Sequence, residues 1–377
     1  MKILYISNSR IPTEKAHGIQ IMKMCEAFGN VEVEIKLILP TRKNKDFEQI
    51  NSFEYYRVNK KFKIKKIFTI DPYLLIKLPQ GIYIKFQAVF YMISLFFYLL
   101  FIQNKQDYIF YTRDEYLLPM LQIFSKRIVW ECHNLPFNRN KYIKYWNRCH
   151  KIICISENLK NELIVCGIDQ SKILIAHDGV DLKDFDIKQH TFELKKELDI
   201  PQDKKIIMYT GHFYKWKGVQ TLADAVRFLS KDYLFIFVGG GDHCFKDFKK
   251  RNSQSNILFT GLQEPHKIPL YLKIADILVL PNSAEDTKSF STSPLKLFEY
   301  MAAGKPIVAA DLSNIREVLD NKNAVFFEAD NSRDLAQKIE SIVEDNELSA
   351  KISKQAYEDV KQYTWSIRAL NIVNFIK

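Results

Sequence analysis

The feature that most constrains the fold is a repeated alternation of short apolar runs, rich in β-branched residues, with stretches of helical periodicity. A helix separates the first two runs, at Ile19–Phe28. This alternation predicts βαβ units and a parallel sheet. In the first half of the chain the expected strands are Lys2–Ser7, Val33–Leu39, Tyr108–Tyr111, Ile128–Glu131, Ile152–Ile155 and Ile173–Ala176.

The same pattern then restarts in the second half. A polar, charged segment at 182–203 comes first and predicts a linker. A helix is expected at Gly218–Phe228, and 377 residues are enough for two domains. We therefore predict two successive α/β domains. The strands of the second are expected at Lys205–Thr210, Leu234–Val238, Ile257–Thr260, Ile277–Leu280 and Ile307–Ala310.

The positive charge is unevenly distributed. Residues 1–180 hold 27 Lys and Arg against 16 Asp and Glu, whereas residues 181–377 hold 28 of each sign. The whole excess of 11 therefore lies in the first half, and it is densest at Lys60–Lys66. A basic domain can face nucleic acid, an anionic membrane or an anionic substrate, and a solvated basic surface is the simplest account of any one lysine.

The six cysteines indicate reduced thiols. They stand at positions 25, 132, 149, 154, 166 and 244 without a C-x-x-C pair, and the chain starts directly with a strand, which leaves no room for a targeting peptide. We therefore expect a cytoplasmic protein. Cys132-His133 and Cys149-His150 match no zinc spacing, so no metal site is predicted.

One segment, Val89–Ile102, has 14 residues without a charge. A spanning helix needs about 20 apolar residues, and Lys85 and Gln87 interrupt an extension toward the N-terminus. A strand follows where a βαβ unit needs a crossover helix, so a buried or half-buried crossover helix is the favoured interpretation. The alternative is an interfacial helix that dips into a membrane with help from Lys60–Lys66.

Residues 289–306, SFSTSPLKLFEYMAAGKP, predict a short buried helix over 294–303 followed by a strand. Ser293 is expected as its N-cap and Pro294 as its first residue, and Gly304 and Pro306 end it. Free N–H groups and the helix dipole make such an N-terminus a possible anion site. A capped helix without a ligand is the simpler interpretation, and Glu299 is the one acid in the stretch.

Other polar and glycine residues are predicted at the same sheet edge. Gly211 lets the backbone turn after the strand Lys205–Thr210, and Lys217 stands just before the next helix, where a lysine suits a phosphate. Gly239–Gly241 follows the next strand, without a G-x-G-x-x-G fingerprint. Each signal alone is weak, since a surface lysine and a tight turn explain them equally well. Together they describe a diphosphate site.

With these residues in order, the chain resembles the retaining glycosyltransferases of family 4, which have the GT-B fold. The second half carries the donor-domain pattern, and the first half carries a glycine-loop segment, a histidine strand and the closing segments of the first domain. The resemblance covers nearly the whole chain. The matching segments are Ala16–Gln20, Trp130–Asn134, Ile155–Glu157, His177–Asp181, Gly211–Gly218, Gly239–Gly241, Gly261, Ala275–Pro281, Ser293–Ala310 and Tyr363–Trp365.

The resemblance implies an α/β fold of two Rossmann-like domains whose parallel sheets face across a cleft. Residues 1–182 would form the acceptor-side domain, residues 183–356 the donor domain, and residues 357–377 a helix that crosses back to the first domain.

The resemblance also implies roles for single residues. Lys217 would bind the donor phosphates, and Glu299, the second glutamate of the family's E-x7-E motif, would hold the nucleotide ribose. His133 would contact the transferred sugar, and Gly18 would let a loop approach the phosphates. Backbone and side chains at Gly240, Ser291, Thr292, Ser293, Pro294 and Leu295 would complete the donor site.

The chain departs from the family pattern at two places. Ser291 stands where the family has the first glutamate of E-x7-E, and Thr292–Pro294 replace a glycine-rich loop. His212 stands where the family has an arginine. A histidine is only partly charged near neutral pH, so Lys217 and the helix would carry more of the phosphate charge.

The implied activity is a retaining, metal-independent transfer of a sugar from a UDP- or GDP-linked donor. The acceptor would be a glycan or a lipid-linked glycan of bacterial surface polysaccharide synthesis, reached from the cytoplasmic face of the membrane. The two departures leave open a catalytically weak protein that binds nucleotide sugars or serves as a scaffold. A nucleic-acid partner is suggested only by the basic pI of about 9.1, and no matching motif supports it.

Overall fold

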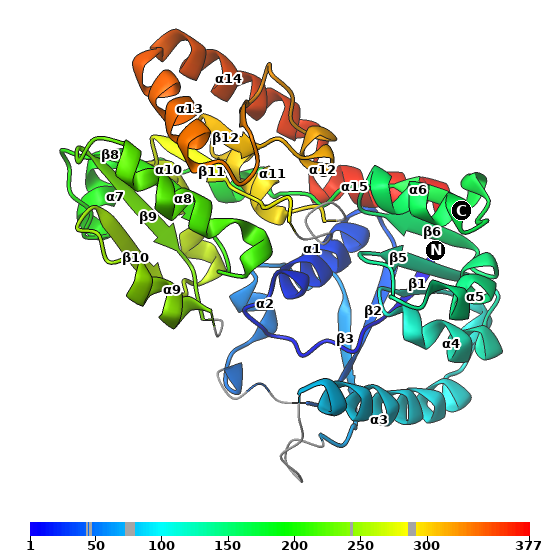
Figure 1. Ribbon diagram of the computed structural model, residues 1–377. Helices are drawn as coiled ribbons and strands as arrows, with labels where there is room; N and C mark the ends of the chain where they lie inside the picture. Colours follow the sequence, from blue (N-terminus) through cyan, green and yellow to red (C-terminus); the bar gives the residue numbers. More distant parts are fainter. Residues whose placement is uncertain (43, 45–46, 72–79, 242–243, 286–291) are drawn as a thin grey trace. The chain divides into compact units, whose positions relative to one another are not determined.

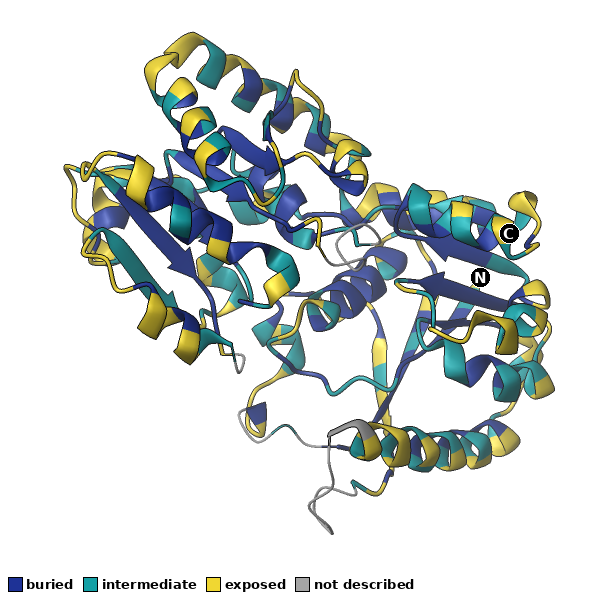
Figure 2. Ribbon diagram, in the orientation of Figure 1, coloured by how far each residue is buried: buried dark blue, intermediate teal, exposed yellow. Residues whose placement is uncertain are grey.

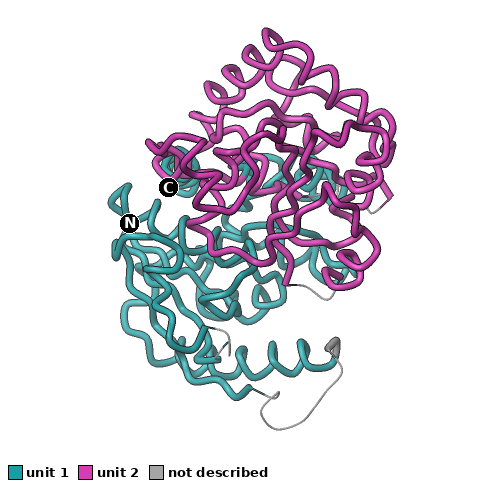
Figure 3. Tube along the Cα trace, turned by 90° about the vertical axis from the view of Figure 1, so that its left-hand side faces the viewer, with its two compact units in different colours: residues 1–177, 365–377 teal, residues 178–364 magenta. Residues whose placement is uncertain are grey.

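The computed structural model describes all residues except 43, 45–46, 72–79, 242–243 and 286–291 (Figure 1). It divides into two compact units, shown in Figure 3. Unit 1 comprises residues 1–177 and 365–377, and unit 2 comprises residues 178–364. The division thus falls at 177/178 and 364/365, where the sequence predicted 182/183 and 356/357.

Unit 1 is built on a seven-stranded parallel sheet in the order β3-β2-β1-β4-β5-β6-β7. Its strands are β1 (Lys2–Ile6), β2 (Glu34–Pro40), β3 (Lys63–Ile67), β4 (Tyr108–Thr112), β5 (Ile128–Cys132), β6 (Lys151–Cys154) and β7 (Ile173–Ile175). The helices are α1 (Ala16–Asn30), α2 (Ser52–Tyr55), α3 (Gln80–Phe101), α4 (Leu118–Phe124), α5 (Ile143–Asn147), α6 (Glu157–Val165) and α15 (Trp365–Ile376).

Unit 2 repeats this plan with a six-stranded parallel sheet in the order β10-β9-β8-β11-β12-β13. Its strands are β8 (Lys205–Thr210), β9 (Tyr233–Val238), β10 (Ile257–Gly261), β11 (Ile277–Leu280), β12 (Ile307–Ala310) and β13 (Val325–Phe327). Its helices are α7 (Thr191–Glu197), α8 (Val219–Ala225), α9 (Phe245–Arg251), α10 (Ile268–Ile274), α11 (Leu295–Ala302), α12 (Ser313–Arg316), α13 (Ser332–Glu344) and α14 (Asn346–Asp359).

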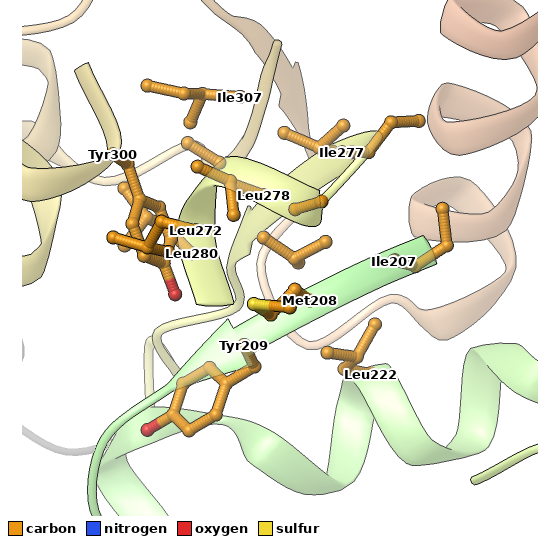
Figure 4. Packing of buried hydrophobic residues seen from close by; sticks show 14 of the residues in the cluster. Ile207, Met208, Tyr209, Leu222, Leu272, Ile277, Leu278, Leu280, Tyr300 and Ile307 are labelled. Atoms are coloured by element: carbon orange, nitrogen blue, oxygen red, sulfur yellow. The ribbon is translucent and has the colours of Figure 1, made fainter. Parts of the chain in front are cut away.

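The predicted α/β class with two parallel sheets is confirmed. The central strands are buried on both faces because helices cover both sides of each sheet (Figure 2), which explains their near-continuous apolar runs. In unit 2, Met208 of β8 packs with Leu278 of β11 and Leu222 of α8 in one core, shown in Figure 4. Tyr300 of α11 reaches the end of β8, where its hydroxyl accepts from the Thr210 N–H at 2.8 Å.

Two strands escaped prediction. The basic run Lys60–Lys66 was interpreted only as a charged surface, but residues from Lys63 onward form β3 at the edge of the first sheet, in parallel register with β2. Lysines that point outward protect an edge strand from pairing with other chains, so the charge pattern is compatible with a strand. The second missed strand is β13, at the edge of the other sheet.

The long apolar helix α3 starts earlier than predicted. Lys85 and Gln87 lie inside it, so the helix has 22 residues rather than the 14 of Val89–Ile102. It connects β3 to β4, which are parallel strands of one sheet. The predicted place of this segment, as the crossover helix between two parallel strands, is therefore confirmed, whereas little of its apolar surface is buried.

Candidate functional site

The topological switch point of unit 2 lies between β8 and β11. From β8 the sheet runs one way through β9 and β10, and from β11 the other way through β12 and β13. Open parallel sheets bind ligands in the crevice outside the carboxyl ends of the strands at this point. The loop after β8 and the loop after β11 meet there, because the Ser283 N–H donates to the Trp216 carbonyl at 3.1 Å. Lys217 lies on the loop after β8, and the loop after β11 leads to the predicted helix, α11.

Lys217 ends a short 3-10 turn, Lys215–Lys217, after β8. Its ammonium lies over the Trp216 ring, 3.7 Å from the ring centroid. Burial lowers the pKa of Lys217 to about 7. Near neutral pH this side chain is therefore only partly charged, and an anion beside it would favour the charged form.

Lys296, in the first turn of α11, is a residue that the sequence analysis missed. It is 8% exposed, and its ammonium lies 3.7 Å from the centroid of the Tyr209 ring at the end of β8. Its Nζ has no hydrogen-bond partner among the described residues. Burial lowers its pKa well below the usual value, the charge of Lys217 lowers it further, and Glu299 opposes both.

Gly211 makes room for this lysine. Its φ is +128°, and a Cβ atom built there would lie 2.7 Å from the Lys296 Nζ. The predicted tight turn after β8 is confirmed. The missing side chain at Gly211 also allows the ammonium group of Lys296 to approach the backbone closely. The helix is held in this position from its next turn by the Tyr300 hydroxyl on the Thr210 N–H.

Glu299 lies one turn beyond Lys296 on the same helix. Burial raises its pKa to about 7, Lys296 lowers it and Asp184 raises it again. The carboxyl group is thus half-ionised near neutral pH. Because the pKa values of Lys217 and Lys296 are lowered as well, the site gains positive charge when an anionic ligand favours the charged forms of the two lysines.

The N-terminus of α11 differs from its prediction. The helix begins at Leu295 with Pro294 as N-cap, whose side chain makes no capping hydrogen bond. Ser293 is not the cap, because its hydroxyl accepts from the Asp178 N–H at 3.2 Å, and the Thr292 carbonyl accepts from the Asn314 side chain at 2.8 Å. Pro294 was predicted as the first helical residue, but the helix begins one residue later, at Leu295. The burial of the helix and its end at Gly304, with φ +63°, are confirmed.

Three further donor-site predictions have different outcomes. His212 follows Gly211 directly, and its ring stacks on Tyr214. Gly240 lies in the turn after β9 with φ +119°, and a Cβ atom there would lie 2.8 Å from the Phe245 ring, so packing explains this glycine. Ser291 lies outside the described residues.

In unit 1, His133 comes directly after β5 and is held by Glu131. The two side chains meet at 2.9 Å between Nε2 and Oε1. Burial lowers the pKa of His133 to about 4, Arg113 adds to this, and Glu131 opposes it. Because an ionised carboxylate only accepts hydrogen bonds, Nε2 carries the proton, and Nδ1 is left as an acceptor.

Glu131 is the centre of a buried polar network. Gln20 of α1 donates to its Oε1 at 2.6 Å, Arg368 of α15 donates to the same oxygen at 2.7 Å, and the Tyr111 hydroxyl donates to Oε2. Burial alone would raise the pKa of Glu131, but Arg368, followed by His133, holds it well below its usual range. The network ties the C-terminal helix to the sheet of unit 1, and sequence reasoning did not find it.

Gly18 was predicted in a loop, but it lies in the first turn of α1. A Cβ atom there would collide with the Tyr56 hydroxyl and lie 2.8 Å from the Thr13 methyl carbon. The Tyr56 hydroxyl accepts from the Thr13 N–H and donates to the Thr13 carbonyl, both at 2.8 Å. The glycine is therefore required by the packing of this tyrosine, whatever else approaches it.

Comparison with known proteins identifies relatives of both the sequence and the fold. Residues 190–359 match the family Glycosyl transferases group 1. The N,N'-diacetylbacillosaminyl-diphospho-undecaprenol alpha-1,3-N-acetylgalactosaminyltransferase of Campylobacter jejuni is 27% identical over 232 residues, 58% of each chain. The Bacillus subtilis glycosyltransferase TuaC, provisionally assigned to teichuronic acid biosynthesis, is 24% identical over 212 residues, 56% of this chain and 51% of that protein.

The fold of the whole chain matches solved structures. The Anabaena protein Alr3699/HepE, in complex with UDP and glucose, superimposes with a TM-score of 0.76 over 99% of this chain and 98% of that one, at 17% identity. The alignments with the two curated relatives span little more than half of their lengths. The chain thus has the GT-B fold of two parallel-sheet domains, and its residues 190–359, within unit 2, are similar to the family Glycosyl transferases group 1.

Proposed function

We propose that this protein is a glycosyltransferase that moves a sugar from a UDP- or GDP-linked donor to a glycan or lipid-linked acceptor, with retention and without a metal ion. The observation that carries the proposal is the pair of lysines at the switch point of unit 2. The buried side chain of Lys296 has no hydrogen-bond partner among the described residues. Lys217 lies beside it, and burial lowers the pKa of Lys217 to about 7. Such a pair calls for a ligand with at least two negative charges, as a diphosphate has.

The chemistry follows from charge placement. When the bond at the anomeric carbon breaks, negative charge grows on the departing diphosphate, and preorganised cations lower the barrier directly. Lys217 and Lys296 would supply the positive charge that a divalent cation supplies in metal-dependent transfer, so activity should persist in EDTA. Glu299 would accept hydrogen bonds from the ribose diol. His133 would offer Nδ1 as an acceptor to a sugar hydroxyl, and Glu131 would hold its ring in place.

The acceptor class is proposed from charge and from the relatives. The Campylobacter jejuni relative is named for a diphospho-undecaprenol-linked acceptor. The positive excess of this chain lies in its first 180 residues, so unit 1 would suit an acceptor that carries phosphates. A role in surface polysaccharide synthesis at the cytoplasmic face of a membrane agrees with both. HPLC and NMR of the product, with the anomeric configuration read from its coupling constants, test transfer and retention together.

A nucleotide panel tests the donor site first. Thermal unfolding with UDP, GDP, ADP, CMP and dTDP is expected to show stabilisation by UDP or GDP. A ligand at about 100 times its dissociation constant adds about 2.7 kcal/mol. Lys217→Ala should abolish the shift. Lys215→Ala should preserve it, since the Lys215 side chain is 89% exposed and pairs with Glu285 on the surface. Absence of any shift in the wild type would favour the scaffold alternative.

The pH dependence of binding gives a second test. A bound phosphate favours the charged form of Lys217, so the bound pKa lies above the free value of about 7. Binding then takes up a proton above pH 7, and affinity should fall as the pH rises from about 7 to 9. Isothermal titration in buffers of different ionisation enthalpy measures this proton uptake.

Glu299 would contribute the opposite slope, because a ribose diol favours its ionised form and its free pKa is also about 7. The titration is therefore repeated with Glu299→Gln, in which the fall should be steeper. Constant affinity across this range in the Glu299→Gln protein would contradict a charged lysine at the phosphates.

A further inference from the structure

Helix α3 presents an apolar surface that the fold of unit 1 does not use. Residues Ile82–Phe101 have a mean hydropathy of 1.8, and by length and composition they could cross a membrane. Only 17% of the most apolar window is buried, so α3 does not resemble the core helix of a water-soluble protein. Figure 2 shows exposed positions along the whole length of this helix.

A narrow stripe attaches α3 to the rest of unit 1. Tyr91, Leu95 and Leu99, four residues apart, are fully buried in the core that also holds Ile38 and Ile67. The Tyr91 hydroxyl donates to the Ile38 carbonyl at 3.2 Å. This stripe lies in the C-terminal half of the helix, and near the start of the helix the Tyr83 hydroxyl donates to Asp71 at 2.9 Å. Helix α3 therefore lies lengthwise against the rest of unit 1 and would have to detach in order to span a bilayer.

The opposite face is apolar and open. Seven of its side chains are between 45% and 81% exposed. Large exposed apolar patches on soluble monomers mark sites of interaction. Over about 20 residues a helix is about 30 Å long, so the face forms a continuous ridge. The seven side chains are Ile82, Phe86, Val89, Ile93, Phe97, Leu100 and Phe101.

Most of the charge beside the ridge is positive, and Asp71, which accepts from the Tyr83 hydroxyl at 2.9 Å, is paired with Arg10. Lys85 is the only charged residue of the helix, and the neighbouring strand β3 exposes Lys63, Lys65 and Lys66. An apolar helix face next to lysines is typical of helices that lie in the plane of an anionic membrane surface. Protection of a sheet edge would account for the lysines, but it leaves the apolar ridge unexplained.

The composition of the ridge also separates a lipid surface from a second copy of the chain. Protein interfaces carry about one hydrogen bond for each 100–200 Å² of buried area. The exposed positions of α3 offer hydrocarbon side chains and a single lysine, without the polar rim that such an interface uses. Acyl chains need no hydrogen bonds, so they fit this face better.

We propose that α3 lies in the lipid–water interface of an anionic bilayer, with its apolar ridge among the acyl chains and the lysines of β3 at the level of the headgroups. Unit 1 would thereby be held where a lipid-linked acceptor is found. That last step rests on the proposed function, whereas binding to the membrane does not depend on it.

Vesicle flotation tests the proposal with the full chain. The protein should float with vesicles of phosphatidylcholine and phosphatidylglycerol at low salt and bind vesicles of phosphatidylcholine alone at least ten-fold more weakly. Each change among Lys63→Gln, Lys65→Gln and Lys66→Gln should weaken binding to the anionic vesicles about five-fold. The double variant Ile93→Glu/Phe97→Glu should stay at the bottom of the gradient.

The matched control is Ile123→Glu/Val165→Glu, which changes two apolar residues of unit 1 that are 72% and 86% exposed outside α3. It should float like the wild type. Stabilisation by the nucleotide, measured on every variant, reports unit 2, so failure of membrane binding and failure of the donor site are distinguishable.

Two results would overturn the proposal. One is that the α3 double variant and the wild type bind anionic vesicles equally well, or that neither of them binds. The other is a dimer of the wild type, seen by analytical ultracentrifugation, that Phe97→Glu dissociates, because the ridge would then join two copies of the chain.

Discussion

Replacing Lys296 by methionine is expected to weaken nucleotide binding strongly and at the same time to raise the stability of the nucleotide-free protein. A buried ammonium without a hydrogen-bond partner destabilises a fold, and methionine has a similar shape without the charge. Lys296 is 8% exposed, and its charge is opposed by that of Lys217. Loss of one charge-assisted contact to a phosphate costs about 1.5–3 kcal/mol, or about 10–100-fold in affinity.

The two opposite effects distinguish a ligand-binding role from a structural one. If the contact of Lys296 with the Tyr209 ring mainly holds α11 on β8, the methionine variant should be less stable than the wild type. Thermal unfolding with and without UDP or GDP measures both quantities on one sample. Lower stability with an unchanged nucleotide shift would refute the assignment of Lys296 to the donor site.

Lys195 provides the matched control for this experiment. It is also 8% exposed, but its ammonium donates to the carbonyls of Gln202 and Lys204, which lie before β8 begins. Lys195→Met leaves these carbonyls without their donor, so it should lower stability. Nucleotide binding should be unchanged, because Lys195 lies in α7 and contacts the segment before the start of β8, away from the carboxyl end of that strand.

The contrast between Lys296 and Glu299 illustrates what the sequence could predict of the site. The position of α11 followed from local signals, chiefly the serine–proline start and the glycine–proline end. The pattern also indicated burial, since little polar surface remained. Lys296 escaped attention because a lysine in an apolar helix normally reaches solvent. Its contact with Tyr209 and its approach to Gly211 depend on how α11 packs on β8, which no spacing in the sequence encodes.

The same limit explains the misjudged elements of unit 1. Strand β3 was missed because three of its five residues are lysines, and only its pairing with β2 makes it a strand. The start of α3 was missed because one lysine and one glutamine were treated as interruptions, whereas an exposed helix tolerates both. Conversely, the buried β-branched strands were predictable, because their pattern depends on a sheet covered on both faces.

The ion pair between Glu131 and Arg368 was the contact least predictable from the sequence. Breaking it is the second change for which we expect a large effect. Arg368→Met should destabilise unit 1 by about 3–5 kcal/mol, since it leaves a carboxylate buried without its counter-charge. Glu131 and Arg368 are both almost fully buried, and Arg368 also donates to the carbonyls of Ala176 and His177. Helix α15 should therefore loosen, which hydrogen exchange of residues 365–376 would detect.

The size of this effect should depend on pH in a defined direction. In the wild type Arg368 helps to hold the pKa of Glu131 well below its usual range, which is near 4.5 in the unfolded chain. The ion pair therefore contributes its full share of the folding stability at any pH above about 4.5. Without Arg368, burial would raise that pKa, and the folded state would bind a proton that the unfolded state releases. The loss of stability should then be smaller at pH 5 than at pH 8.

Arg316→Met supplies the comparison, because Arg316 makes a two-pronged ion pair with Asp311 at 2.7 and 2.9 Å on the surface of unit 2. Exposed pairs contribute at most about 1 kcal/mol, so this variant should unfold nearly as the wild type does. Urea unfolding of both variants at the two pH values decides the question. An Arg368→Met protein as stable as the Arg316→Met protein at pH 8 would show that the polar network does not hold α15. The helix would then depend on its apolar face against α1 and the sheet.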